Sequence, residues 1–87
     1  MLAEFYGTPI VADRRLIDAY ARVRDYRRAA AIWEAIVKQE PNNTQNRVSW
    51  AATYVQMGNR ERAIRILEDA AALNPSFRPQ ADQLIRD

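Results

Sequence analysis

The stretch YRRAAAIWEAIVKQEP at residues 26–41 returns in related form as RERAIRILEDAAALNP at residues 60–75. Both segments place alanines and large apolar residues three and four positions apart, which is the spacing of one face of a helix. Both end on a proline, which cannot continue a helix without losing a hydrogen bond. The sequence therefore predicts two related helices, over residues 26–40 and 60–73.

The shift of 34 residues that relates these two segments also aligns residues on either side of them. The aligned pairs are Leu16 and Trp50, Tyr20 and Tyr54, Asp25 and Asn59, Arg28 and Arg62, Ala29 and Ala63, Ile32 and Ile66, Glu34 and Glu68, and Pro41 and Pro75. Further apolar stripes at helical spacing predict helices over residues 9–23, 44–57 and 78–86, and no strand pattern competes with them. Because the connections are short, successive helices are expected to be antiparallel neighbours in an all-α fold.

Residues that favour helix ends stand in the breaks between these stripes. Gly58 follows the third predicted helix, where a left-handed residue is favoured. The expected N-terminal caps are Thr8 followed by Pro9, Asp25, Asn43, Asn59 and Ser76. Trp33 and Trp50 lie on predicted core stripes, so we interpret both as interior packing residues.

A unit of 34 residues made of helix, turn, helix and closing proline resembles the tetratricopeptide repeat. The resemblance rests on an aromatic residue in each first helix (Tyr20 and Tyr54), a small residue in each second helix (Ala29 and Ala63) and the closing prolines. It covers residues 10–43 and 44–77 as full repeats, with residues 78–87 as a capping or partial-repeat helix and residues 1–8 as an N-terminal stub. It implies a right-handed superhelix of antiparallel helix pairs.

The first repeat departs from the family pattern, because Arg24 stands where the second repeat has Gly58. Repeat folds generally need about three units to bury a continuous core. We therefore expect this single domain, residues 1–87, to be an excerpt of a longer protein or to self-associate.

The composition argues against catalysis. There are 13 basic and 11 acidic residues, a net charge of only +2, and neither Cys nor His occurs. Disulfides, thiolate metal sites and a histidine base are thereby excluded. No glycine-rich phosphate loop accompanies the carboxylates. We expect a binding protein without enzyme activity, cofactor or metal, and with no segment that inserts into a membrane. The lack of Cys suits cytoplasm and periplasm equally.

The resemblance implies a concave groove lined by the first helix of each pair. Carried onto this chain, the resemblance implies that the residues that bind a peptide or partner are Arg14, Asp18, Arg22, Gln45, Val48, Ala52, Val55 and Gln56. The same family positions add Val11, Ala21, Asp82 and Arg86. A basic part on the first repeat beside an apolar floor on the second would suit a peptide or partner domain that has an acidic group next to an apolar anchor.

Several alternatives stay open at this point. Arg14, Asp18 and Arg22 also form an ordinary ladder of ion pairs at i,i+4 spacing, which we favour over a dedicated site. Val48, Ala52 and Val55 would equally well pack on a neighbouring helix or a second chain, giving a homo-oligomer. Arginines between residues 14 and 28 would meet nucleic-acid phosphates, but Asp18 and Asp25 interrupt them and argue against that function.

A second resemblance concerns the parent protein. LIDAYA at residues 16–21, IWE at residues 32–34 and NPSF at residues 74–77 look like repeat tails of bacterial multi-pass O-antigen polymerase or ligase proteins. That resemblance implies an accessory tail whose catalytic machinery lies elsewhere.

Overall fold

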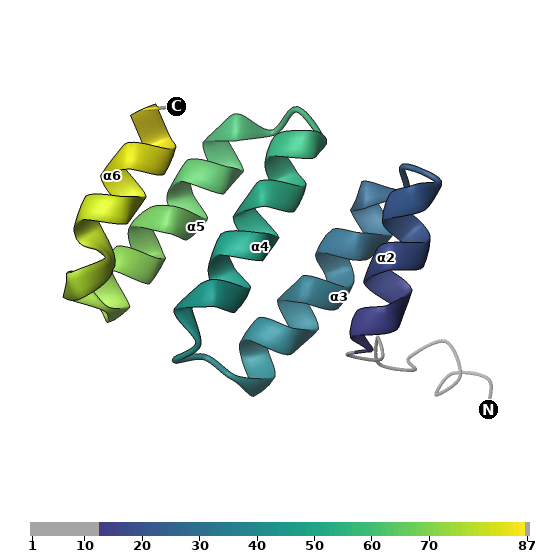
Figure 1. Ribbon diagram of the computed structural model, residues 1–87, viewed down its shortest axis with the longest axis horizontal. Coiled ribbons are helices and arrows are strands. Elements are labelled where there is room, and N and C mark those ends of the chain that lie inside the picture. Colours follow the sequence, from purple (N-terminus) through teal and green to yellow (C-terminus); the bar gives the residue numbers. More distant parts are fainter. Residues whose placement is uncertain (1–12, 87) are drawn as a thin grey trace.

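A computed structural model describes residues 13–86 of the chain. In this range the elements are α2 (Arg14–Arg22), α3 (Tyr26–Gln39), α4 (Thr44–Gln56), α5 (Arg60–Leu73), the 3₁₀ helix η1 (Pro75–Phe77) and α6 (Arg78–Arg86). Each helix packs against the next along the chain, and Figure 1 shows them side by side in one row. The predicted all-α fold of antiparallel helix pairs is confirmed. The N-terminal stub and the Thr8–Pro9 cap lie outside the described residues, as does Val11.

The two helix pairs repeat each other in atomic detail. The side chains of Asp25 and Asn59 each accept a hydrogen bond at 3.2 Å, from the backbone amides of Arg28 and Arg62 respectively. In both pairs the amide of the capping residue donates to the carbonyl of the preceding tyrosine, at 2.8 Å for Tyr20 and 2.9 Å for Tyr54. The guanidinium of Arg28 lies 5.8 Å from the ring centre of Tyr20, and that of Arg62 lies 5.3 Å from the ring centre of Tyr54. The aligned tyrosines, capping residues and arginines of the two pairs therefore make the same contacts.

The core consists of two clusters, one for each helix pair. The first contains Ile17, Ala29, Ile32 and Ile36, and the second contains Ala51, Ala63, Ile66, Leu67, Ala70, Ala71, Phe77 and Ala81. Ala29 and Ala63 are each 1 % exposed, and their small side chains let neighbouring helices approach closely. Trp33 and Trp50 are half-buried and pack against the first and second cluster respectively, as expected for interior packing.

Two predicted helix starts are corrected. α2 begins at Arg14, inside the predicted range 9–23, because Asp13 is extended and its carboxylate accepts a hydrogen bond from the Arg15 amide at 2.9 Å. Residues 9–12 of the predicted helix lie outside the described residues. Hydrogen bonds from Arg15 also lower the pKa of the Asp13 carboxyl. They therefore favour the negatively charged carboxylate, which is the form that a helix N-terminus stabilises. Ser76 is not a cap: it lies inside η1 and donates to the side chain of Asn74 at 2.7 Å. Asp25, Asn43 and Asn59 are confirmed as N-caps.

The two helix hairpins differ at one strained position. Gly58 has φ 80°, and the equivalent Arg24 has φ 60°, so an arginine occupies a left-handed conformation that favours glycine. Left-handed strain costs about 1–2 kcal/mol, and the entropy lost by glycine offsets about 0.5–1 kcal/mol of that cost. We therefore expect Arg24→Gly to stabilise the fold by about 0.5 kcal/mol. Chemical denaturation measures the change.

The reciprocal substitution Gly58→Ala is the control for this prediction. An added Cβ at Gly58 would have no heavy atom within 4 Å, so only the backbone conformation is tested. Gly58→Ala is expected to destabilise the protein by a similar amount. A lower stability of Arg24→Gly than of the parent chain would show that the Arg24 side chain makes contacts that outweigh the strain.

Candidate functional site

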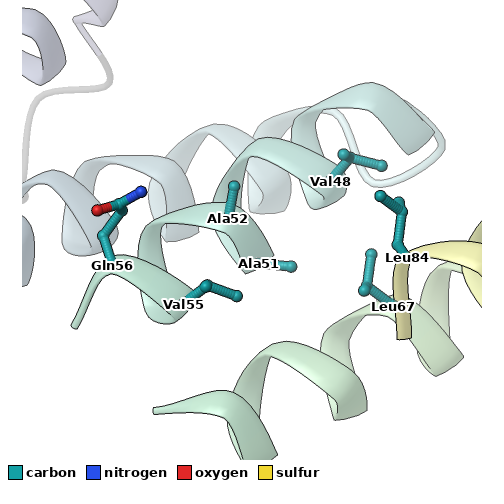
Figure 2. Close-up of a pocket in the computed structure, with 7 residues that line it drawn as sticks. All are labelled: Val48, Ala51, Ala52, Val55, Gln56, Leu67 and Leu84. Carbon is teal, nitrogen blue, oxygen red and sulfur yellow. The ribbon is translucent and has the colours of Figure 1, made fainter. Parts of the chain in front are cut away.

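An apolar surface hollow lies between α4 and α6, with Leu67 of α5 at its floor. It has two parts, of about 190 Å³ and about 230 Å³, which share Val48 of α4 and Leu84 of α6. We call the two parts together the α4–α6 groove. Its lining consists of seven apolar residues and four glutamines, namely Val48, Ala51, Ala52, Val55, Leu67, Phe77 and Leu84 with Gln45, Gln56, Gln80 and Gln83. Figure 2 shows the first part, with Val48 and Leu84 on facing walls.

The groove exists because α4 and α6 present more apolar side chains than the core absorbs. Ala51 and Leu67 are buried in the second core cluster, at 2 % and 6 % exposure. Val55 and Leu84, in contrast, remain 51 % and 43 % exposed at the groove surface. Exposed large apolar side chains that gather around a hollow are typical of an interaction site, whereas single scattered ones are not.

Among residues 13–86, no charged side chain lines either part of the groove. The four glutamines supply both hydrogen-bond donors and acceptors at the rim, without a net charge. Such a surface can receive apolar side chains and pair with the backbone amides of a bound segment. It offers no acid, base or nucleophile of the kinds that carry catalysis.

The structure brings together five of the residues that the sequence placed at the binding surface. They are Gln45, Val48, Ala52, Val55 and Gln56, and all of them lie on α4 and line the groove. Asp82 and Arg86 of α6 do not line it. Asp82 instead pairs with Arg78, at 3.5 Å, one turn earlier on the same helix.

Arg14, Asp18 and Arg22 lie apart from the groove, on α2. Arg14 bridges the two helix pairs: its Nη2 donates to Oδ1 of the buried Asn46 at 3.1 Å, and its guanidinium lies 5.4 Å from the ring centre of Trp33. Within residues 13–86 no ion pair joins Arg14 to Asp18 or Asp18 to Arg22. The expected ion-pair ladder is therefore wrong, because Arg14 reaches across to α3 and α4 instead of along its own helix.

Sequence reasoning missed the α6 wall of the groove. Leu84 belongs to the last apolar stripe, together with Ala81 and Ile85. Ala81 is fully buried and Ile85 packs on the second cluster, so Leu84 is the member of this stripe that the core leaves exposed. The available signal was that this nine-residue helix carries a third apolar residue, Leu84, besides the two that contact the core.

A row of antiparallel helix hairpins with a groove along the first helix of successive pairs defines a helical repeat protein. A family model described as "Tetratricopeptide repeat" matches residues 20–87. The chain therefore belongs to the tetratricopeptide repeat family, whose members generally act as protein-interaction modules. No curated protein and no solved structure matches the chain. The comparisons give no support to the second resemblance, to tails of O-antigen polymerases or ligases.

Proposed function

We propose that this chain is a non-enzymatic interaction module and that the α4–α6 groove binds a peptide segment of a protein partner. The observation that carries the proposal is the uncharged, apolar lining between two successive first helices, with Val55 and Leu84 exposed. Repeat proteins generally use such concave surfaces to hold extended or helical ligands.

The chemistry of the lining suggests the chemistry of the ligand. Two or three apolar side chains of the segment would fill the two parts of the groove. The rim glutamines would pair with its backbone or with amide side chains. The sequence predicted that Arg14 and Arg22 would form a basic part of the binding surface, but both lie on α2, apart from the groove. An acidic group on the ligand would have to reach beyond the groove to meet them.

A selection from a displayed peptide library against the intact chain tests this function, followed by titration calorimetry of the recovered peptides. Val55→Asp is expected to weaken their binding at least about tenfold, because an unpaired carboxylate would enter an apolar contact. The matched control is Val23→Asp, the same substitution at a residue that is 72 % exposed and remote from the groove. Equal affinity of the Val55→Asp and parent proteins would overturn the proposed site.

A second copy of the chain is the competing occupant of the same surface. Leu73 and Leu84 are 58 % and 43 % exposed near the C-terminal end of the row of helices. Self-association through this end would give a molar mass that rises with concentration in light scattering. The Val55→Asp variant would then shift the monomer–dimer equilibrium, which separates this function from peptide binding.

A further inference from the structure

Exposed arginines cluster along one edge of the row of helices. The turns α2–α3 and α4–α5 and the end of α6 lie along one edge (Figure 1). Arg60 of the second turn ties the end of α6 to this edge by donating to the Ile85 carbonyl at 2.6 Å. We call residues 22–28 and 57–62 together with Arg86 the turn edge.

Among the described residues, the turn edge carries seven basic residues and two acidic ones, Asp25 and Glu61. The seven are Arg22, Arg24, Arg27, Arg28, Arg60, Arg62 and Arg86, and all are exposed. The carboxylate of Asp25 is engaged within the chain, since it caps α3 and pairs with Arg28 at 3.1 Å. A chain of small net charge thus carries a cluster of seven exposed arginines along this edge.

Two large apolar side chains stand at the tips of the same edge. Val23 and Met57 are the residues that end α2 and α4, and they are 34 positions apart. Their exposures are 72 % and 38 %, and neither belongs to a core cluster. The turn of each helix hairpin therefore carries an exposed apolar residue. Val23 stands between Arg22 and Arg24, and Met57 is followed by Arg60 and Arg62.

We propose that the turn edge docks on the surface of an anionic lipid bilayer. The arginines would contact the phosphate and carboxylate groups of the lipids, while Val23 and Met57 would enter the boundary between headgroups and acyl chains. The docking is peripheral: no helix within residues 13–86 has the length and apolar character needed to cross a bilayer. It uses a different surface from the α4–α6 groove, so one chain can engage both ligands.

The edge fits a lipid surface better than it fits a nucleic acid. Binding to single strands relies on aromatic rings on which bases stack. The rings of Tyr20 and Tyr54, which lie beside the two turns, are covered by Arg28 and Arg62 of the same chain. Exposed aliphatic tips add nothing to phosphate recognition, whereas they contribute to partition into an interface.

Co-sedimentation with vesicles tests the proposal. One set of vesicles is phosphatidylcholine alone, and in the other phosphatidylserine replaces part of it. The chain is expected to bind the anionic set, and binding is expected to fall as salt is raised. Arg24→Gly combined with Arg27→Gln is expected to weaken binding about 25-fold, at about fivefold for each arginine. The matched control is Lys38→Gln combined with Arg78→Gln, which removes the same charge from the opposite edge, where α3 ends and α6 begins.

A second variant tests the apolar tips, with Val23→Ser and Met57→Ser combined. It is expected to weaken vesicle binding several-fold while leaving retention on heparin unchanged, because the charge is unaltered. Circular dichroism of each variant establishes that the fold is retained. Equal binding to both kinds of vesicle would overturn the proposal. So would equal losses in the turn-edge double variant and in its control on the opposite edge, or binding to homopolymeric RNA without binding to anionic vesicles.

Discussion

Trp33→Ala is expected to lower the free energy of unfolding by about 3–5 kcal/mol, the range typical of aromatic truncations in a packed interior. The indole packs against the first core cluster and also lies under the guanidinium of Arg14, which in turn bonds to Asn46 of α4. Its loss would therefore weaken both the first helix pair and the contact between the two pairs. A chain of 87 residues has a total free energy of unfolding of only about 4–13 kcal/mol, so this loss is a large part of it. At about 4 °C or more for each kcal/mol, the melting temperature should fall by at least about 12 °C.

The other repeat supplies the control for this experiment. The position equivalent to Trp33 is Leu67, which is 6 % exposed in the second cluster. Trp33→Leu should therefore fit the repeat architecture and cost less than half as much as Trp33→Ala. Melting of both variants is followed by circular dichroism at a helix wavelength. A Trp33→Ala protein that melts at the parent temperature would show that Trp33 is not an interior packing residue.

The helices were predictable wherever a capping residue and an apolar stripe agreed. The second helix of each pair was expected over residues 26–40 and 60–73, and the observed helices are Tyr26–Gln39 and Arg60–Leu73. Asp25 and Asn59 fix their starts by side-chain hydrogen bonds, which depend on local sequence alone. The 34-residue shift then carries the arrangement of one pair onto the other.

The errors arose where the sequence offered more than one local solution. Asp13 caps α2 inside the range that was predicted as one helix, because its carboxylate bonds to the backbone locally instead of continuing a helix. The predicted Thr8–Pro9 cap lies outside the described residues. Arg24 was recognised as a departure from glycine. Its positive φ was not predicted, since the turn geometry is imposed by packing of the whole hairpin.

The candidate groove was half-predictable for a related reason. Helical periodicity put Val48, Ala52 and Val55 on one face of α4, and they share that face in the structure. Whether a face becomes a groove depends on what stands opposite, and the α6 wall was not identified from the sequence. In the same way, equal spacing placed Arg14 and Asp18 on one side of α2, but the long arginine side chain made contacts on other helices.

Phe77→Ala is expected to release α6 from the rest of the protein. Phe77 is 6 % exposed in η1 and belongs to the second core cluster together with Ala81 of α6. Truncation of a buried phenylalanine costs about 3–5 kcal/mol. In a repeat protein each element is stabilised by its neighbours only, so this loss falls on the last helix first. A nine-residue helix has no stability by itself, and the Arg60–Ile85 hydrogen bond, at about 1 kcal/mol, cannot replace the lost packing.

Amide hydrogen exchange distinguishes this local release from global unfolding. Amides of α6 should exchange as in an unfolded chain, while those of α3 keep their protection. The control is Leu73→Ala, which removes a residue that is 58 % exposed and should change exchange in neither helix. Both parts of the groove need Leu84, so peptides that bind the parent protein should lose affinity for Phe77→Ala but not for Leu73→Ala. Parent-like protection of α6 in Phe77→Ala would mean that the contacts of Ala81 and Ile85 alone hold this helix. The α6 wall of the groove would then be held by the packing of α6 on α5, and not by Phe77 in η1.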